Sequence, residues 1–147
     1  VPLVLFLRMA LNAIDGMLAR EHDMKTQLGA VLNELGDVVS DTALYLPLAL
    51  VPAFHLWLVV GLVILGVMVE MVGVMAIQIG AARNYAGPMG KSDRAFVVGA
   101  LALVTALRPQ ALAFWPWLFG LATALAALTC LRRCQAALSE RAAARRS

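Results

Sequence analysis

The sequence predicts an all-α protein, a polytopic bundle of transmembrane helices, and two observations lead to this fold class. The first is composition: 62% of the residues are hydrophobic and only 14% are charged, with a mean hydropathy of +0.83, whereas a soluble domain carries about 25% charged residues. The second is that the apolar residues gather in long stretches with basic residues in alternate connections between them. Lipid must therefore replace water around much of the surface.

Five apolar stretches are present, and each is interpreted as a helical span. The second, third and fifth reach the length of about 20 residues that crosses a bilayer core. The first is cut short at its start, and the fourth must take in residues 92–94 to be long enough. Because backbone groups in hydrocarbon must satisfy one another, these segments should be helices, and no alternation of period two suits a barrel. The stretches cover approximately residues 2–18, 28–51, 56–82, 95–107 and 111–131.

The basic residues predict how the spans are oriented. Ten lie in the connections after spans one and three and in the C-terminal tail, and one, Arg108, lies in the two opposite connections. Positive residues accumulate on the cytoplasmic side of membrane proteins, so the first group of connections should face the cytoplasm. We expect a transmembrane domain over residues 1–132 and a cytoplasmic basic tail over residues 133–147. The ten residues are Arg20, Lys25, Arg83, Lys91, Arg94, Arg132, Arg133, Arg141, Arg145 and Arg146.

Carboxylates inside the predicted spans are the strongest indication of function. Ionisable groups in a bilayer are costly and mark functional sites by default. At about 100° per residue, four polar residues of the second span fall on one wedge of its surface. Carboxylates gathered in low dielectric need a positive partner, and oxygen donors suit Mg²⁺ or Mn²⁺. An internal salt-bridge network involving Arg8 is the alternative. The carboxylates are Asp15, Glu34, Asp37, Asp41 and Glu70, and Asn33 shares the wedge with Glu34, Asp37 and Asp41.

The segment from Asn12 to Asp37 reads NAIDGMLAREHDMKTQLGAVLNELGD. It resembles the signature of the CDP-alcohol phosphatidyltransferase superfamily, D-x2-D-G-x2-A-R-x8-G-x3-D-x3-D, and the chain as a whole is similar to class-I bacterial membrane members. Asn12 and Asn33 replace the first and third aspartates of the signature. Family members have six transmembrane helices, so the resemblance implies five spans present of six, with the N-terminal part missing. The matching positions are Asp15, Gly16, Ala19, Arg20, Gly29 and Asp37.

The resemblance also implies a reaction, in which the hydroxyl of an acceptor alcohol displaces CMP from CDP-diacylglycerol or a related CDP-alcohol during phospholipid biosynthesis. Asp37 would be the catalytic base, and Mg²⁺ or Mn²⁺ would be the cofactor. Lys91 and Arg94 would bind a phosphate on the acceptor, unless they are ordinary flanking cations. The metal would be held by Asn12, Asp15, Asn33 and Asp37, with Glu34 and Asp41 as auxiliary ligands, and the CDP moiety by Gly16, Arg20 and Thr26.

The sequence leaves three alternatives open. Asn12 and Asn33 could mark a family member with weakened or lost catalysis, the carboxylates could serve a small ion- or proton-coupled transporter, or the donor could be a non-lipid CDP-alcohol. The expected partners are the CDP-alcohol, the acceptor alcohol, the lipid bilayer and a second copy of the chain in a homodimer, with no nucleic acid. The expected location is the bacterial inner membrane, with the active site facing the cytoplasm.

Overall fold

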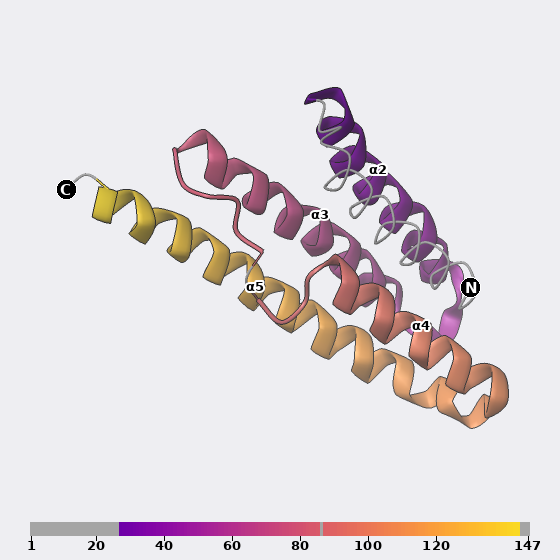
Figure 1. Ribbon diagram of the computed structural model, residues 1–147. Helices are drawn as coiled ribbons and strands as arrows, with labels where there is room; N and C mark the ends of the chain where they lie inside the picture. Colours follow the sequence, from indigo (N-terminus) through magenta and orange to yellow (C-terminus); the bar gives the residue numbers. More distant parts are fainter. Residues whose placement is uncertain (1–26, 86, 145–147) are drawn as a thin grey trace.

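The computed structural model describes residues 27–85 and 87–144, and this part of the chain is helical without a strand. The described residues form four α-helices, and short 3-10 helices connect α2 to α3 and α4 to α5 (Figure 1). The all-α fold predicted from composition is confirmed. The α-helices are α2 (Gln27–Tyr45), α3 (Leu56–Gln78), α4 (Lys91–Leu107) and α5 (Trp115–Ala144), and the 3-10 helices are η1 (Leu46–Leu50), η2 (Pro52–Phe54) and η3 (Pro109–Phe114).

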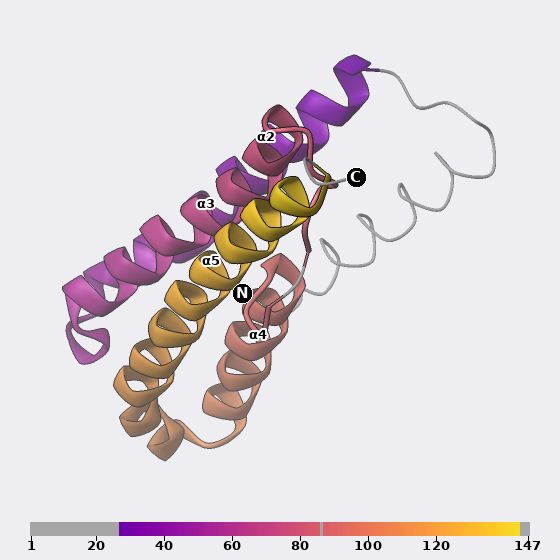
Figure 2. The same ribbon diagram turned by 90° about the vertical axis from the view of Figure 1, so that its left-hand side faces the viewer.

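The helices are arranged around α3, which runs parallel to α5 (Figures 1 and 2). α2 packs against α3, while α4 is shorter and lies along the first half of α5. The start of α2, the end of α3 and the end of α5 lie toward one end of the bundle. The 3-10 connections lie at the opposite end (Figure 1). This arrangement brings the polar face of α2 next to α3 and the beginning of α4.

The contact between α3 and α5 depends on small residues at regular spacing. Buried positions recur every three or four residues on both helices, as expected for one face of an α-helix. Glycine and alanine on these faces let the two backbones approach closely, which is how helices associate in lipid. The buried residues are Val59, Leu62, Gly66, Val69, Glu70, Gly73 and Ala76 on α3 and Trp115, Phe119, Ala122, Ala126, Thr129, Arg133 and Ala137 on α5.

Helix boundaries differ from the apolar stretches in two places. α2 ends at Tyr45, and the chain continues as 3-10 helices that start around Pro47 and Pro52, because proline cannot donate the backbone hydrogen bond that would extend the α-helix. α5 runs past residue 132 to Ala144, so residues 133–144 of the predicted tail are helical. Their alanines and leucine are strong helix formers. α4 begins at Lys91, so the helix in the fourth apolar stretch does include residues 92–94, as expected.

Two segments of the described chain are long and apolar enough to cross a membrane. These are Leu56–Gln78 and the continuous segment Pro109–Ala144. α2 carries three carboxylates and α4 has only 17 residues, with Lys91, Asp93 and Arg94 in its first turn. The number of spans predicted from the sequence is therefore not confirmed by helix length and composition.

The connection from α3 to α4 lies against α5 rather than standing away from it. Gly87, which has a φ of 122°, sits so near Thr129 of α5 that a Cβ atom there would lie 2.3 Å from the threonine methyl group. Glycine is thus required both by the backbone angle and by the contact. At the end of the connection, the amide of Gly90 donates a hydrogen bond to Asp93 at 3.0 Å. This contact fixes the start of α4 and therefore the place of Lys91.

Candidate functional site

The polar face of α2 is directed into the protein at Asp37 and Asp41. These two residues are four apart, so they lie one above the other on the helix, and both are buried. Glu34 is half-buried and Asn33 is exposed. The sequence predicted that these four residues share a wedge, and the structure places each of the two buried carboxylates beside a cation from α4.

Asp37, the last residue of the signature, forms an ion pair with Lys91. The Nζ of Lys91 contacts Oδ2 of Asp37. The carboxylate side chain is only 6% exposed, whereas the lysine side chain is 31% exposed. A base candidate and a cation from another helix thus meet at a place that solvent can partly reach.

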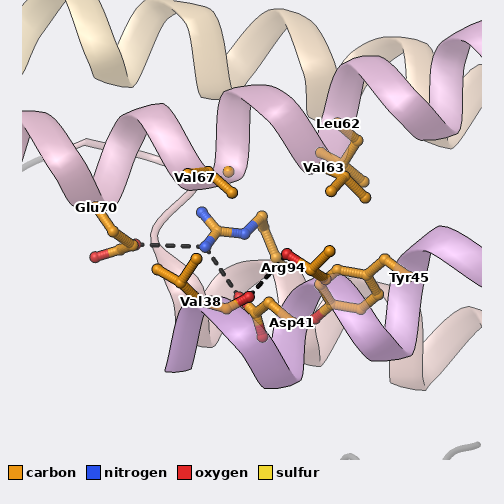
Figure 3. Close-up of a pocket in the computed structure, with 10 residues that line it drawn as sticks. Val38, Asp41, Tyr45, Leu62, Val63, Val67, Glu70 and Arg94 are labelled. Carbon is orange, nitrogen blue, oxygen red and sulfur yellow. Dashed lines mark hydrogen bonds and ion pairs between the residues drawn. The ribbon is translucent and has the colours of Figure 1, made fainter. Parts of the chain in front are cut away.

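Asp41 is bound by Arg94, which also reaches α3. Figure 3 shows the guanidinium group of Arg94 between Asp41 on α2 and Glu70 on α3. Its Nη2 donates to Asp41 at 3.1 Å and to Glu70 at 3.4 Å, and its Nη1 donates to the carbonyl of Met89 at 3.1 Å. A planar guanidinium can serve several acceptors at once because its donors form a fixed fork. Arg94 therefore joins three helices and the connection before α4.

A second buried arginine, Arg133 on α5, completes this cluster. Its Nη1 donates to the carbonyl of Val69 at 2.8 Å and lies 3.7 Å from Oε2 of Glu70, while its Nη2 donates to the carbonyl of Tyr85 at 3.4 Å. From the sequence, Arg133 was expected in the basic tail, and this buried role was missed. The indication was present, since Arg133 continues the spacing of Ala126 and Thr129 along the buried face of α5.

Two glycines on α3 make room for the two guanidinium groups. A Cβ atom at Gly66 would lie 3.2 Å from Nε of Arg94, and one at Gly73 would lie 3.1 Å from Nη1 of Arg133. Glu70 stands between these glycines on the same face and is itself buried. The pattern Gly66-x3-Glu70-x2-Gly73 is thus a seat for two arginines with one carboxylate between them.

Glu34 has a partner in the connection between α3 and α4. Both of its carboxylate oxygens accept hydrogen bonds from Arg83, whose guanidinium carbon lies 4.7 Å from the ring centroid of Tyr85. The hydrogen bond to Glu34 raises the pKa of Arg83 above its ordinary value. Arg83 therefore stays protonated at neutral pH and holds the connection against α2.

These pairs bear on the two explanations offered for the carboxylates of the predicted spans. Glu34, Asp41 and Glu70 each contact an arginine, which favours the salt-bridge network for these three, with Arg83, Arg94 and Arg133 as the partners. Arg8 lies outside the described residues. The auxiliary metal role of Glu34 and Asp41 stays a prediction. So does an acceptor-binding role for Lys91 and Arg94. The predicted residues Asn12, Asp15, Gly16, Arg20 and Thr26 lie outside the described residues.

The donor atoms of α2 suit a hard divalent cation. Asn33 and Asp37, one turn apart, offer an amide oxygen and a carboxylate, which are ligands of Mg²⁺ and Mn²⁺. Within residues 27–85 and 87–144, no three His, Cys, Asp or Glu side chains converge as a metal site. The metal-binding set that the signature implies, Asn12, Asp15, Asn33 and Asp37, stays a prediction, since Asn12 and Asp15 lie outside the described residues.

The space around Arg94 is too small for a substrate. The cavity beside its guanidinium group has a free volume of about 10 Å³, which is no more than one water molecule needs. It is enclosed by α2, α3 and α4, with Tyr45 and Leu62 among its apolar walls. The inner cluster is thus packed protein, in contrast to the partly exposed contact of Lys91 with Asp37.

Comparisons with known proteins agree with the signature. A family model described as CDP-alcohol phosphatidyltransferase matches residues 2–131. The chain is 46% identical over 138 residues to "Inner membrane protein YnbA" of Escherichia coli (strain K12), a match that covers 94% of this chain and 69% of that protein. No solved structure gives a significant match.

Proposed function

Because the chain belongs to the CDP-alcohol phosphatidyltransferase family, we propose that it transfers a phosphatidyl group from CDP-diacylglycerol, or a related CDP-alcohol, to the hydroxyl of an acceptor alcohol. CMP is released, and the reaction belongs to phospholipid biosynthesis. The observation that carries this proposal is the burial of Asp37, the last signature residue, beside a cation from α4. Family membership also argues against a transporter.

In this reaction, Asp37 accepts the proton of the attacking hydroxyl. The hydroxyl oxygen forms a bond to the phosphorus that carries the diacylglycerol, the bond from that phosphorus to the bridging oxygen breaks, and CMP leaves with the bonding electrons. General-base assistance of this kind contributes a factor of about 10²–10⁴ in rate. Lys91 lies beside Asp37, where its positive charge is suited to a phosphate of the donor or the acceptor.

Asn12, Asp15, Asn33 and Asp37 would hold Mg²⁺ or Mn²⁺, as the resemblance implies. The metal would supply neutralisation of the diphosphate. Arg20, with Gly16 and Thr26, would bind the CDP moiety, and the guanidinium fork of an arginine is suited to phosphate oxygens. The described part of this set, Asn33 and Asp37, offers the oxygen donors that such a metal requires.

We expect CMP release to depend on Mg²⁺ or Mn²⁺. Neutral Asn12 and Asn33 leave the site with less negative charge than the family signature provides, so the metal should bind weakly to the free protein and more tightly when diphosphate oxygens are present. Titration of Mg²⁺ with and without a CDP-alcohol, followed by calorimetry, measures this difference, and chelation should stop turnover. Full CMP release in excess chelator would refute the proposed cofactor.

The acceptor is identified by an assay of the protein in nanodiscs with CDP-diacylglycerol, Mg²⁺ and a panel of alcohols. The panel should include glycerol 3-phosphate, inositol phosphate, serine and glycerol, so that charged and neutral acceptors are compared. CMP and the lipid product are measured together. A catalytically weakened member would give slow but acceptor-dependent CMP release, and a donor other than a lipid would show no turnover until CDP-diacylglycerol is replaced by a soluble CDP-alcohol.

We propose that the active site faces the cytoplasm from the inner membrane. Support comes from the inner-membrane relative and from the basic connections, which by the positive-inside tendency belong to the cytoplasmic side. In a Cys130→Ala/Cys134→Ala background, an impermeant thiol reagent added to spheroplasts should label Gln110→Cys and spare Lys25→Cys. Labelling of Lys25→Cys alone would show that the orientation is the opposite of the one proposed.

A further inference from the structure

We propose that Arg94 is a positioning residue, which fixes α4 against α2 so that Lys91 and Asp37 meet; this rests on the function proposed above. Two ion pairs join α4 to α2, one above the other along the two helices, and each is called a rung below. Lys91 with Asp37 is the outer rung, and Arg94 with Asp41 is the inner rung. Because the partners are three residues apart on α4 and four apart on α2, both rungs lie on one side of each helix.

The inner rung is held from several directions. Glu70 accepts a hydrogen bond from Arg94, and Arg133 lies within ion-pair distance of Glu70. The carbonyl of Met89, two residues before α4, is also bound by Arg94. The inner rung therefore ties the beginning of α4 to α2 and α3 together. A shift of α4 along α2 would break the contacts of Arg94 with Asp41 and with Glu70 together.

Burial separates the tasks of the two rungs. The side chain of Arg94 is 2% exposed and that of Lys91 is 31% exposed, and the cavity beside Arg94 has room for about one water molecule. Arg94 therefore acts through Lys91 and Asp37, while Lys91 is the cation that can reach a ligand. A misplacement of about 1 Å at a reacting centre can lower the rate about 10²-fold. A small displacement of α4 that moves Lys91 away from Asp37 should therefore slow the reaction.

The first arm of the test measures helix placement without reference to activity. Val39 on α2 and Phe96 on α4 are exposed apolar residues, and spin labels at Val39→Cys and Phe96→Cys report the distance between the helices. The native cysteines are replaced by Cys130→Ala and Cys134→Ala, and the protein is held in nanodiscs. The otherwise unchanged protein should give one narrow distance distribution by double electron–electron resonance.

The variants remove the inner rung in graded ways. Arg94→Lys keeps the charge but loses the fork. Arg94→Met combined with Asp41→Asn removes one cation and one anion together, so that the remaining carboxylate, Glu70, still has Arg133 as its partner and the fold should survive. Gly66→Ala displaces the guanidinium group sterically, because its Cβ would lie 3.2 Å from Nε of Arg94. Gly61→Ala on the same helix is the matched control, since its Cβ would make only an ordinary 3.5 Å contact with Thr123.

We expect the double variant and Arg94→Lys to broaden or shift the distance distribution and to lower kcat at least about tenfold, with the KM for the CDP-alcohol changed by less than about threefold. Gly66→Ala should do the same to a smaller extent, and Gly61→Ala should do neither. An unchanged distance distribution in the double variant overturns the proposal, whatever happens to kcat. If the parent protein releases no CMP with any donor, the proposed function fails, while the distance measurement still decides whether Arg94 positions α4.

Discussion

Asp37→Asn should abolish turnover while leaving the binding of the CDP-alcohol largely intact. The amide keeps the size of the side chain but cannot accept the proton of the attacking hydroxyl, so the expected loss in kcat is about 10²–10⁴-fold. The measurement is CMP release under saturating donor and acceptor, together with the dissociation constant of the CDP-alcohol.

The control for this substitution is Glu140→Gln, the same change of carboxylate to amide at an exposed position. Glu140 accepts a hydrogen bond from the amide of Ala82 at 2.9 Å, which the glutamine oxygen can also accept. Its kcat should therefore match that of the unsubstituted protein. If Asp37→Asn keeps more than about a tenth of the rate, Asp37 is not the general base.

Among the substitutions described here, Arg133→Met should lower the free energy of unfolding most. It removes a guanidinium group that lies near the buried Glu70 and binds the carbonyls of Val69 and Tyr85. Removing one partner of a buried ion pair typically costs about 3–5 kcal/mol because the other charge remains buried. Arg94 still contacts Glu70, so we expect the lower part of this range. The measurement is thermal or chemical unfolding in detergent micelles.

Arg132→Met provides the matched control, because Arg132 is the adjacent residue on α5 and is exposed. Its unfolding free energy should stay within about 0.5 kcal/mol of the parent value, as is usual for surface substitutions. Equal destabilisation by both substitutions would mean that the loss of a positive charge explains the result, rather than the loss of the buried contacts that Arg133 makes beside Gly73 and Glu70. If Arg133→Met is as stable as the parent, the buried contacts of Arg133 do not stabilise the fold.

The sequence predicted the fold class well because the membrane restricts what a chain can be. Long apolar stretches leave helices as the main solution, and the helical segments found in the described residues follow those stretches. The ends were harder to predict from hydropathy alone. At Pro47 the α-helix gives way to 3-10 structure inside an apolar stretch, and past residue 132 a helix continues through charged sequence. Hydropathy indicates whether a residue prefers water or an apolar environment, but it does not indicate where the backbone hydrogen bonds of a helix begin and end.

The site was predictable on α2 and less so elsewhere. The spacing of Asp37 and Asp41 is enough to place them on one face, because that relation lies within one helix. Their partners Lys91 and Arg94 come from α4, which is distant in the sequence, and residue spacing alone cannot pair residues on different helices. Arg133 was missed for a related reason: it follows Arg132 in a basic run, and only the register of α5 separates the buried residue from its exposed neighbour.

The same limit applies to the prediction that Glu34 and Asp41 are auxiliary metal ligands. That idea assumed that the carboxylates face an unfilled site. In the structure, Arg83 and Arg94 contact them, so charge is already balanced at both places.

The most direct test of the transferase assignment is the ratio of CMP to phosphodiester lipid formed from CDP-diacylglycerol labelled with ³²P in the phosphate next to the glycerol. We predict one CMP for each labelled phosphodiester in the presence of the right acceptor, with formation of both products slowed about 10²–10⁴-fold by Asp37→Asn. CMP released together with labelled phosphatidic acid would indicate hydrolysis by water. That result, or an absence of CMP with every donor and acceptor, would contradict the transfer of a phosphatidyl group to an alcohol.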